Sequence, residues 1–87
     1  GEIVPGTVRE QTLLTLSNVA AVLAQDGLGP ADIVRCGVFL SSIDDFDEMD
    51  AAYREFFAGT ILPARTTVGA GLLGISVEID CIAVAPS

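Results

Sequence analysis

An arginine and a glutamate on two strand-like segments are the residues best suited to bind and transform a small acid. Arg65 follows Pro63 and enters a β-branched segment, in a chain that has only four basic residues. A guanidinium presents paired planar donors that fit a carboxylate at two points. Glu78 lies between Val77 and Ile79, so we expect it to be partly buried and able to transfer protons. Together they predict a pocket for a small carboxylic acid with a general acid or base beside it.

The composition of the 87-residue chain points to an oligomer that makes no membrane contact. Hydrophobic residues make up 51% of the sequence, and the mean hydropathy is +0.59. A domain of this length buries only about 60–65% of its unfolded surface. We therefore expect part of the apolar surface to lie between subunits. No apolar run is long enough to span a bilayer.

The charge and the cysteine count exclude several classes of partner and cofactor. The net charge is −8, and four scattered arginines cannot build a phosphate-binding surface, so we expect no nucleic-acid binding. Cys36 and Cys81 each lie in a strand-like run, which favours two reduced, buried thiols in a cytoplasmic protein, with a cross-strand disulfide as the alternative. The chain has no histidine, so the usual zinc ligand sets are unavailable. The acids between residues 44 and 50 lack the spacing of a calcium loop and suit a helix N-terminus instead.

Residue spacing predicts two helices that position these groups. Thr7 and Glu10 have the spacing of a capping box, and the helix should run to about Gln25 and end at Gly27. A turn over residues 1–6 should precede it. Asp45 and Glu48 suggest a second capping box before the next helix. The expected buried stripes are Leu13, Leu16, Val19, Val22 and Leu23 on the first helix, and Phe46, Met49, Tyr53, Phe56 and Phe57 on the second.

Three segments read as strands, over residues 33–40, 66–70 and 76–84. The first is apolar at nearly every position except Arg35, which is typical of a strand covered on both faces. In the last, Glu78 and Asp80 share one face, and Val77 and Ile79 share the other. The order α-β-α-β-β predicts an α+β fold, with two helices on one face of a sheet, in a single domain over residues 1–87. Three strands are few for an independent sheet, so something should complete it.

An ordered set of short segments resembles one known family across essentially the whole chain. The most specific are Pro63-Ala64-Arg65-Thr66-Thr67-Val68 and Val77-Glu78-Ile79. They are preceded by GEIVPG at residues 1–6, QT at 11–12, LSNV at 16–19 and the stretch from Asp45-Phe46 to Tyr53. On these residues the chain resembles the YjgF/RidA family of reactive-intermediate (enamine/imine) deaminases, also described as endoribonuclease L-PSP-like.

The resemblance implies a chorismate-mutase-like α+β fold and a homotrimer with active sites in the clefts between subunits. The sequence does not contain the N-terminal β-hairpin of the family, or the tyrosine and glycine that those strands contribute. The loop over residues 71–76 is also shorter than the usual family pattern.

The resemblance also implies a role for each candidate site residue. Arg65 would hold the substrate carboxylate, the backbone N–H of Thr67 would meet the same group, and Glu78 would position the attacking water and handle protons. The structural alternatives are a salt bridge for Arg65, a rim carboxylate or an interface partner of Arg65 for Glu78, and a plain strand former for Thr67. Asp50 replaces the asparagine common in the family, and we interpret it as a solvated helix residue.

The activity implied is hydrolysis of 2-iminobutanoate or 2-iminopropanoate to a 2-keto acid and ammonia. No metal or organic cofactor is expected, because an imine carbon is already electrophilic. The alternative is a non-catalytic trimer that binds small carboxylates such as 2-keto acids. A nuclease or translation inhibitor, also associated with the family, is disfavoured by the charge and the lack of histidine.

Overall fold

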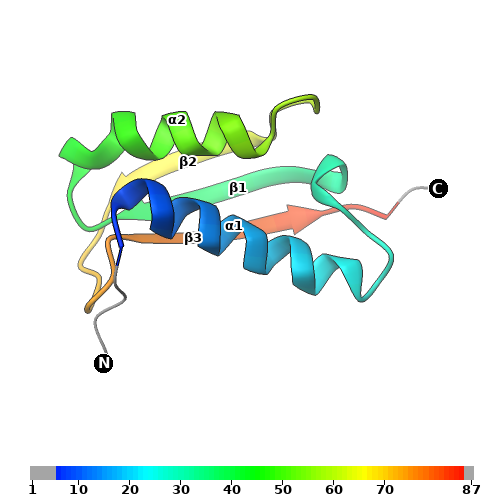
Figure 1. Ribbon diagram of the computed structural model, residues 1–87, viewed down its shortest axis with the longest axis horizontal. Helices are drawn as coiled ribbons and strands as arrows, with labels where there is room; N and C mark the ends of the chain where they lie inside the picture. Colours follow the sequence, from blue (N-terminus) through cyan, green and yellow to red (C-terminus); the bar gives the residue numbers. More distant parts are fainter. Residues whose placement is uncertain (1–5, 86–87) are drawn as a thin grey trace.

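The computed structural model describes residues 6–85 and shows two helices on one face of a mixed sheet (Figure 1). The elements in chain order are α1 (Val8–Ala24), β1 (Ile33–Leu40), α2 (Phe46–Phe56), β2 (Ala64–Gly69) and β3 (Val77–Ala83). The predicted order of helices and strands is confirmed. The turn expected over residues 1–6 lies outside the described residues except for Gly6.

The sheet has the order β2-β1-β3, so the first strand of the chain is its centre. β1 pairs parallel with β2 and antiparallel with β3. The parallel pair needs a crossover connection, which α2 supplies. Cys36 on β1 lies opposite Arg65 on β2 and Cys81 on β3. These three residues therefore form one row across the sheet, on the face that the helices cover.

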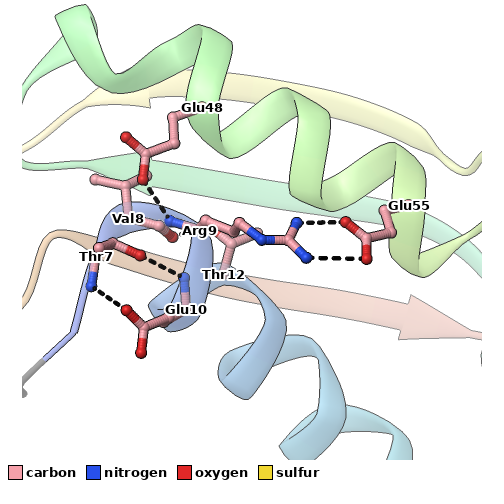
Figure 2. A network of polar contacts seen from close by, with 7 residues as sticks. All are labelled: Thr7, Val8, Arg9, Glu10, Thr12, Glu48 and Glu55. Atoms are coloured by element: carbon pink, nitrogen blue, oxygen red, sulfur yellow. Dashed lines mark hydrogen bonds and ion pairs between the residues drawn. The ribbon is translucent and has the colours of Figure 1, made fainter.

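The predicted capping box begins α1. The Thr7 hydroxyl accepts a hydrogen bond from the Glu10 N–H at 3.1 Å, and the Glu10 carboxylate accepts one from the Thr7 N–H at 3.2 Å (Figure 2). Gly27 has a φ of +74° just beyond the C-terminal cap, as predicted. The buried stripe differs from the prediction, because Thr12 and Leu16 are fully buried whereas Val22 is 64% exposed.

The capping box predicted for α2 is wrong. A 3₁₀ turn over Ile43–Asp45 leads into the helix, and the Asp45 side chain makes no capping hydrogen bond. Glu48 instead accepts a hydrogen bond at 2.9 Å from the backbone N–H of Arg9, in the first turn of α1. The Arg9 guanidinium in turn pairs with Glu55 on α2 through both of its terminal nitrogens (Figure 2). These polar contacts join the start of α1 to α2.

The hydrophobic core fills the space between the helices and the sheet. Tyr53 and Phe57 are almost fully buried, and their ring centroids are 4.9 Å apart, which confirms Tyr53 as a core residue. The core residues are Leu16, Ile33, Cys36, Val38, Leu40, Met49, Tyr53, Phe57, Val77 and Ile79.

The other face of the sheet is not covered by any described element. Arg35 on β1 is exposed on this face, so the expectation that the strand is covered on both faces is wrong within the single chain. Val68 on β2 and Ile82 on β3 are 41% and 57% exposed. No helix within residues 6–85 is long and apolar enough to cross a membrane.

Candidate functional site

Arg65 is held against α2 by aromatic rings and a carboxylate. It lies on the edge strand β2, and its guanidinium carbon is 4.7 Å from the centre of the Tyr53 ring and 5.2 Å from that of Phe46. Its Nη1 donates to Oδ1 of Asp50 at 2.6 Å. A cation over aromatic faces is stabilised by the ring quadrupole, most strongly where water is excluded. The guanidinium is therefore partly desolvated and fixed in orientation.

Asp50 joins Arg65 to a second arginine. Its Oδ2 accepts from Nε of Arg54 at 2.9 Å, across one turn of α2. Burial alone would raise the pKa of Asp50, but the hydrogen bonds from Arg65 and Arg54 outweigh it and hold that pKa below its usual value. The interpretation of Asp50 as a solvated helix residue is wrong. Its helical spacing from Phe46 and Tyr53, four and three residues away, was the signal that could have placed it on this face.

One edge of the Arg65 guanidinium has no hydrogen-bond partner among the described residues. Within residues 6–85, Nη1 is bonded to Asp50, whereas Nη2 and Nε donate to no described group. Beside Arg65 lies a hollow of about 160 Å³ that is also lined by Tyr53, Arg54, Leu62 and Pro63. Paired guanidinium donors bind a carboxylate at two points. The geometry thus leaves Arg65 able to take an anionic group while it remains bonded to Asp50.

Thr67 lies two residues beyond Arg65 on the same face of β2. Its hydroxyl oxygen is buried and has no hydrogen-bond partner among the described residues. A buried hydroxyl without a partner costs free energy, so such an atom calls for a water molecule or a ligand. Arg65 and Thr67 therefore lie near each other on one face of β2.

Glu78 lies away from both residues. Its side chain points to the uncovered face of the sheet, beside Phe39, and it is exposed rather than partly buried as expected. Arg65 points to the opposite face, and β1 separates the two strands. A single chain therefore does not form the pocket expected from the two residues together. A site that uses both requires a second chain.

No metal site is found in the described part of the chain, where no three histidine, cysteine or acidic residues could hold an ion together. The two cysteines are free, and their sulfurs are 3.0 Å apart. Neither Cys36 nor Cys81 was a candidate site residue in the sequence.

The mixed sheet, its two helices and the arginine on the edge strand define a small α+β domain suited to binding a small anion. The model of the endoribonuclease L-PSP family matches residues 1–85, and the chain belongs to this family, the YjgF/RidA proteins. The YjgF gene product of Escherichia coli is 36% identical and has a TM-score of 0.91, over 95% of this chain and 68% of that one. The predicted family and fold class are confirmed.

Two relatives are similar to this chain over most of its length. The mitochondrial protein mmf2 of Schizosaccharomyces pombe is 44% identical over 95% of this chain and 69% of its own length. TdcF of Escherichia coli, named as a proposed reactive intermediate deaminase, is 35% identical over 97% and 67%. Its structure with bound serine has a TM-score of 0.90 at 32% identity, over 95% of this chain and 68% of that one. The chain spans about two thirds of the length of these relatives.

Proposed function

We propose that this protein hydrolyses small 2-imino acids, such as 2-iminobutanoate and 2-iminopropanoate, to 2-keto acids and ammonia. The observation that carries the proposal is Arg65, which is fixed against two aromatic rings and has one donor edge without a hydrogen-bond partner among residues 6–85. The related TdcF structure contains serine, a small molecule that also has a carboxylate. The name of TdcF supports deamination as the reaction class.

In the proposed mechanism, the free edge of Arg65 pairs with the substrate carboxylate and the backbone N–H of Thr67 donates to the same group. Glu78 holds a water molecule whose oxygen attacks the imine carbon. Transfer of the water proton to the imine nitrogen gives a carbinolamine. Its C–N bond then breaks, ammonia leaves, and the remaining hydroxyl loses its proton to become the keto oxygen. One water is consumed, C–O bonds replace the C–N bonds, and nothing is oxidised or reduced, so the reaction needs no redox cofactor.

We propose that the complete site lies between the chains of a homotrimer. Arg65 and Glu78 point to opposite faces of one sheet, so they can meet only when Glu78 comes from another copy. The exposed apolar side chains Val68 and Ile82 on the uncovered face support an assembly that buries this face. Such an assembly would also give Glu78 the burial that one chain does not provide.

The Arg65→Ala variant tests this function. We expect kcat/KM for an imino acid, generated in the assay by an amino acid oxidase, to fall roughly 100-fold, because a charge-assisted carboxylate contact is lost. The matched control is Arg9→Ala, which also removes one guanidinium charge, but from an exposed ion pair with Glu55 that does not line the hollow beside Arg65. We expect it to keep most of the activity, and native mass spectrometry should show the same assembly for both variants. Full activity in Arg65→Ala would refute the proposal.

A non-catalytic carboxylate-binding protein is the second candidate function. Asp50 already bonds to Arg65, so an anionic substrate must share the guanidinium with it. Glu78 is exposed, so the single chain does not give it the burial expected of a group that transfers protons. Both observations favour ligand binding without turnover. Calorimetric binding of 2-oxobutyrate that depends on Arg65, together with no acceleration of imine hydrolysis, would favour this candidate over the enzyme.

A further inference from the structure

Cys36 and Cys81 lie directly opposite each other on the antiparallel strands β1 and β3, with their sulfur atoms 3.0 Å apart. Both side chains point to the face covered by the helices, and both thiols are free. We propose that these residues form a redox-active dithiol, which a hydroperoxide oxidises to a disulfide within one chain. The chemistry is independent of the function proposed for Arg65.

The backbone is already placed for this bond. Residues directly opposite in an antiparallel pair have Cα atoms about 4.5–5.5 Å apart. This spacing lies within the range of about 4.4–6.8 Å that disulfides span. The neighbouring pairs Gly37–Asp80 and Val38–Ile79 keep the register on one side of the cysteines. Oxidation therefore requires side-chain rotation rather than movement of a strand.

The two sulfurs differ in access to solvent. Cys36 is fully buried, whereas Cys81 is partly exposed and lines an open groove of about 450 Å³ between α1 and β3. Val19, Val22 and Leu23 form most of the helix side of this groove. A small uncharged hydroperoxide can enter an apolar groove more easily than a charged oxidant. The oxidant would therefore meet Cys81 first.

The pKa values of the two thiols also favour a reaction between them. A hydrogen bond from Cys81 lowers the pKa of Cys36 to about 7, against the opposing effect of burial, and the Tyr53 hydroxyl and the charge of Arg65 lower it further. The contact with Cys36 and burial raise the pKa of Cys81. Either sulfur can act as the donor in this contact. These shifts place the negative charge on Cys36 and keep the proton on Cys81, so the Cys36 thiolate is placed to accept the Cys81 proton as Cys81 reacts.

The reaction has two steps. The Cys81 thiol gives its proton to the Cys36 thiolate while the Cys81 sulfur attacks one oxygen of the hydroperoxide. The O–O bond breaks, a sulfenic acid forms on Cys81, and the leaving oxygen takes up a proton from solvent and departs as water or an alcohol. The Cys36 sulfur then attacks the sulfenic sulfur, the S–O bond breaks, and the hydroxide leaves as water with the thiol proton. Two thiols are oxidised to one disulfide, and one hydroperoxide is reduced.

Intact mass spectrometry of the wild-type protein after hydrogen peroxide treatment tests the proposal without any variant. We expect a loss of two hydrogens per chain, no alkylation of either cysteine in denaturant, no covalent dimer, and recovery of both thiols with dithiothreitol. Two thiols that still alkylate, a gain of oxygen in place of the hydrogen loss, or bonds between chains would each overturn it.

The Cys36→Ser variant separates the two roles. Because it lacks the second sulfur, the Cys81 sulfenic acid should persist and be trapped by dimedone, whereas Cys81→Ser should give no dimedone adduct at the buried Cys36. Dimedone trapping at Cys36 in Cys81→Ser, with none at Cys81 in Cys36→Ser, would contradict the assignment. Circular dichroism confirms that each variant is folded before treatment.

Discussion

Asp50 accepts a hydrogen bond from the guanidinium of Arg65, to which we propose that a substrate carboxylate binds. The two side chains are bonded at 2.6 Å, so an incoming carboxylate must share the guanidinium with an existing anion. We expect Asp50→Asn to bind 2-oxobutyrate roughly 10-fold more tightly, because like-charge repulsion is removed while an amide oxygen can still accept from Arg65. Isothermal titration calorimetry measures the change.

The matched control for this prediction is Asp47→Asn. It removes one negative charge from the first turn of the same helix, and Asp47 makes no described contact with Arg65. Its affinity should stay close to that of the wild-type protein. Equal gains in the two variants would show that the effect comes from net charge rather than from the Asp50 contact.

The bonds between Asp50 and its two arginines also make the free energy of unfolding depend on pH. The arginines hold the pKa of Asp50 below its usual value, so the folded state favours the carboxylate over the acid. The contribution of ionised Asp50 to the free energy of unfolding is fully present above the ordinary carboxyl pKa of 3.8. It is lost as the pH falls through the lowered pKa of Asp50 in the folded state. Urea unfolding should show a constant difference between wild type and Asp50→Asn at neutral pH, and the difference should shrink in acid. A difference that grew with acidification would contradict the lowered pKa.

At the scale of elements, only a few side chains of α1 are buried against the core. Leu16 is completely buried against the core, whereas Leu14, two residues away, is 53% exposed. We expect Leu16→Ala to lower the free energy of unfolding by about 3 kcal/mol, since it leaves a cavity. Leu14→Ala should change it by about 0.5 kcal/mol or less. Chemical denaturation followed by circular dichroism compares the two, and equal losses would mean that the helix packs on a different face.

The boundaries of the elements follow from local chemistry to different degrees. Thr7 and Glu10 cap α1 because both partners lie within one turn of each other. The same spacing at Asp45 and Glu48 fails, because Glu48 meets the distant backbone N–H of Arg9 instead. The pattern at Asp45 therefore marks the start of α2 correctly, although its side chains make no capping hydrogen bond there.

At the scale of the whole molecule, the proposed site needs two chains. Mixing Arg65→Ala chains with Glu78→Gln chains should restore activity, because some clefts then combine an intact Arg65 with an intact Glu78. With equal mixing in a closed ring, roughly one quarter of the clefts are complete. Assays of each variant alone give the baseline. A mixture no more active than the average of the two would show that the residues do not act across an interface.

The sequence by itself determined the family, the order of the elements, the α+β class and the face alternation along β3. These depend on local spacing and short ordered motifs, such as Pro63 to Val68, which are present in the chain before it folds.

Only the tertiary structure decided the surroundings of these residues. The crossover through α2 brings Asp50, Phe46 and Tyr53 onto Arg65. The sheet order separates Arg65 from Glu78 and sets Cys36 against Cys81. Such contacts join residues up to 45 positions apart. They depend on which strands pair and which face each helix covers, and local residue spacing carries no information about either.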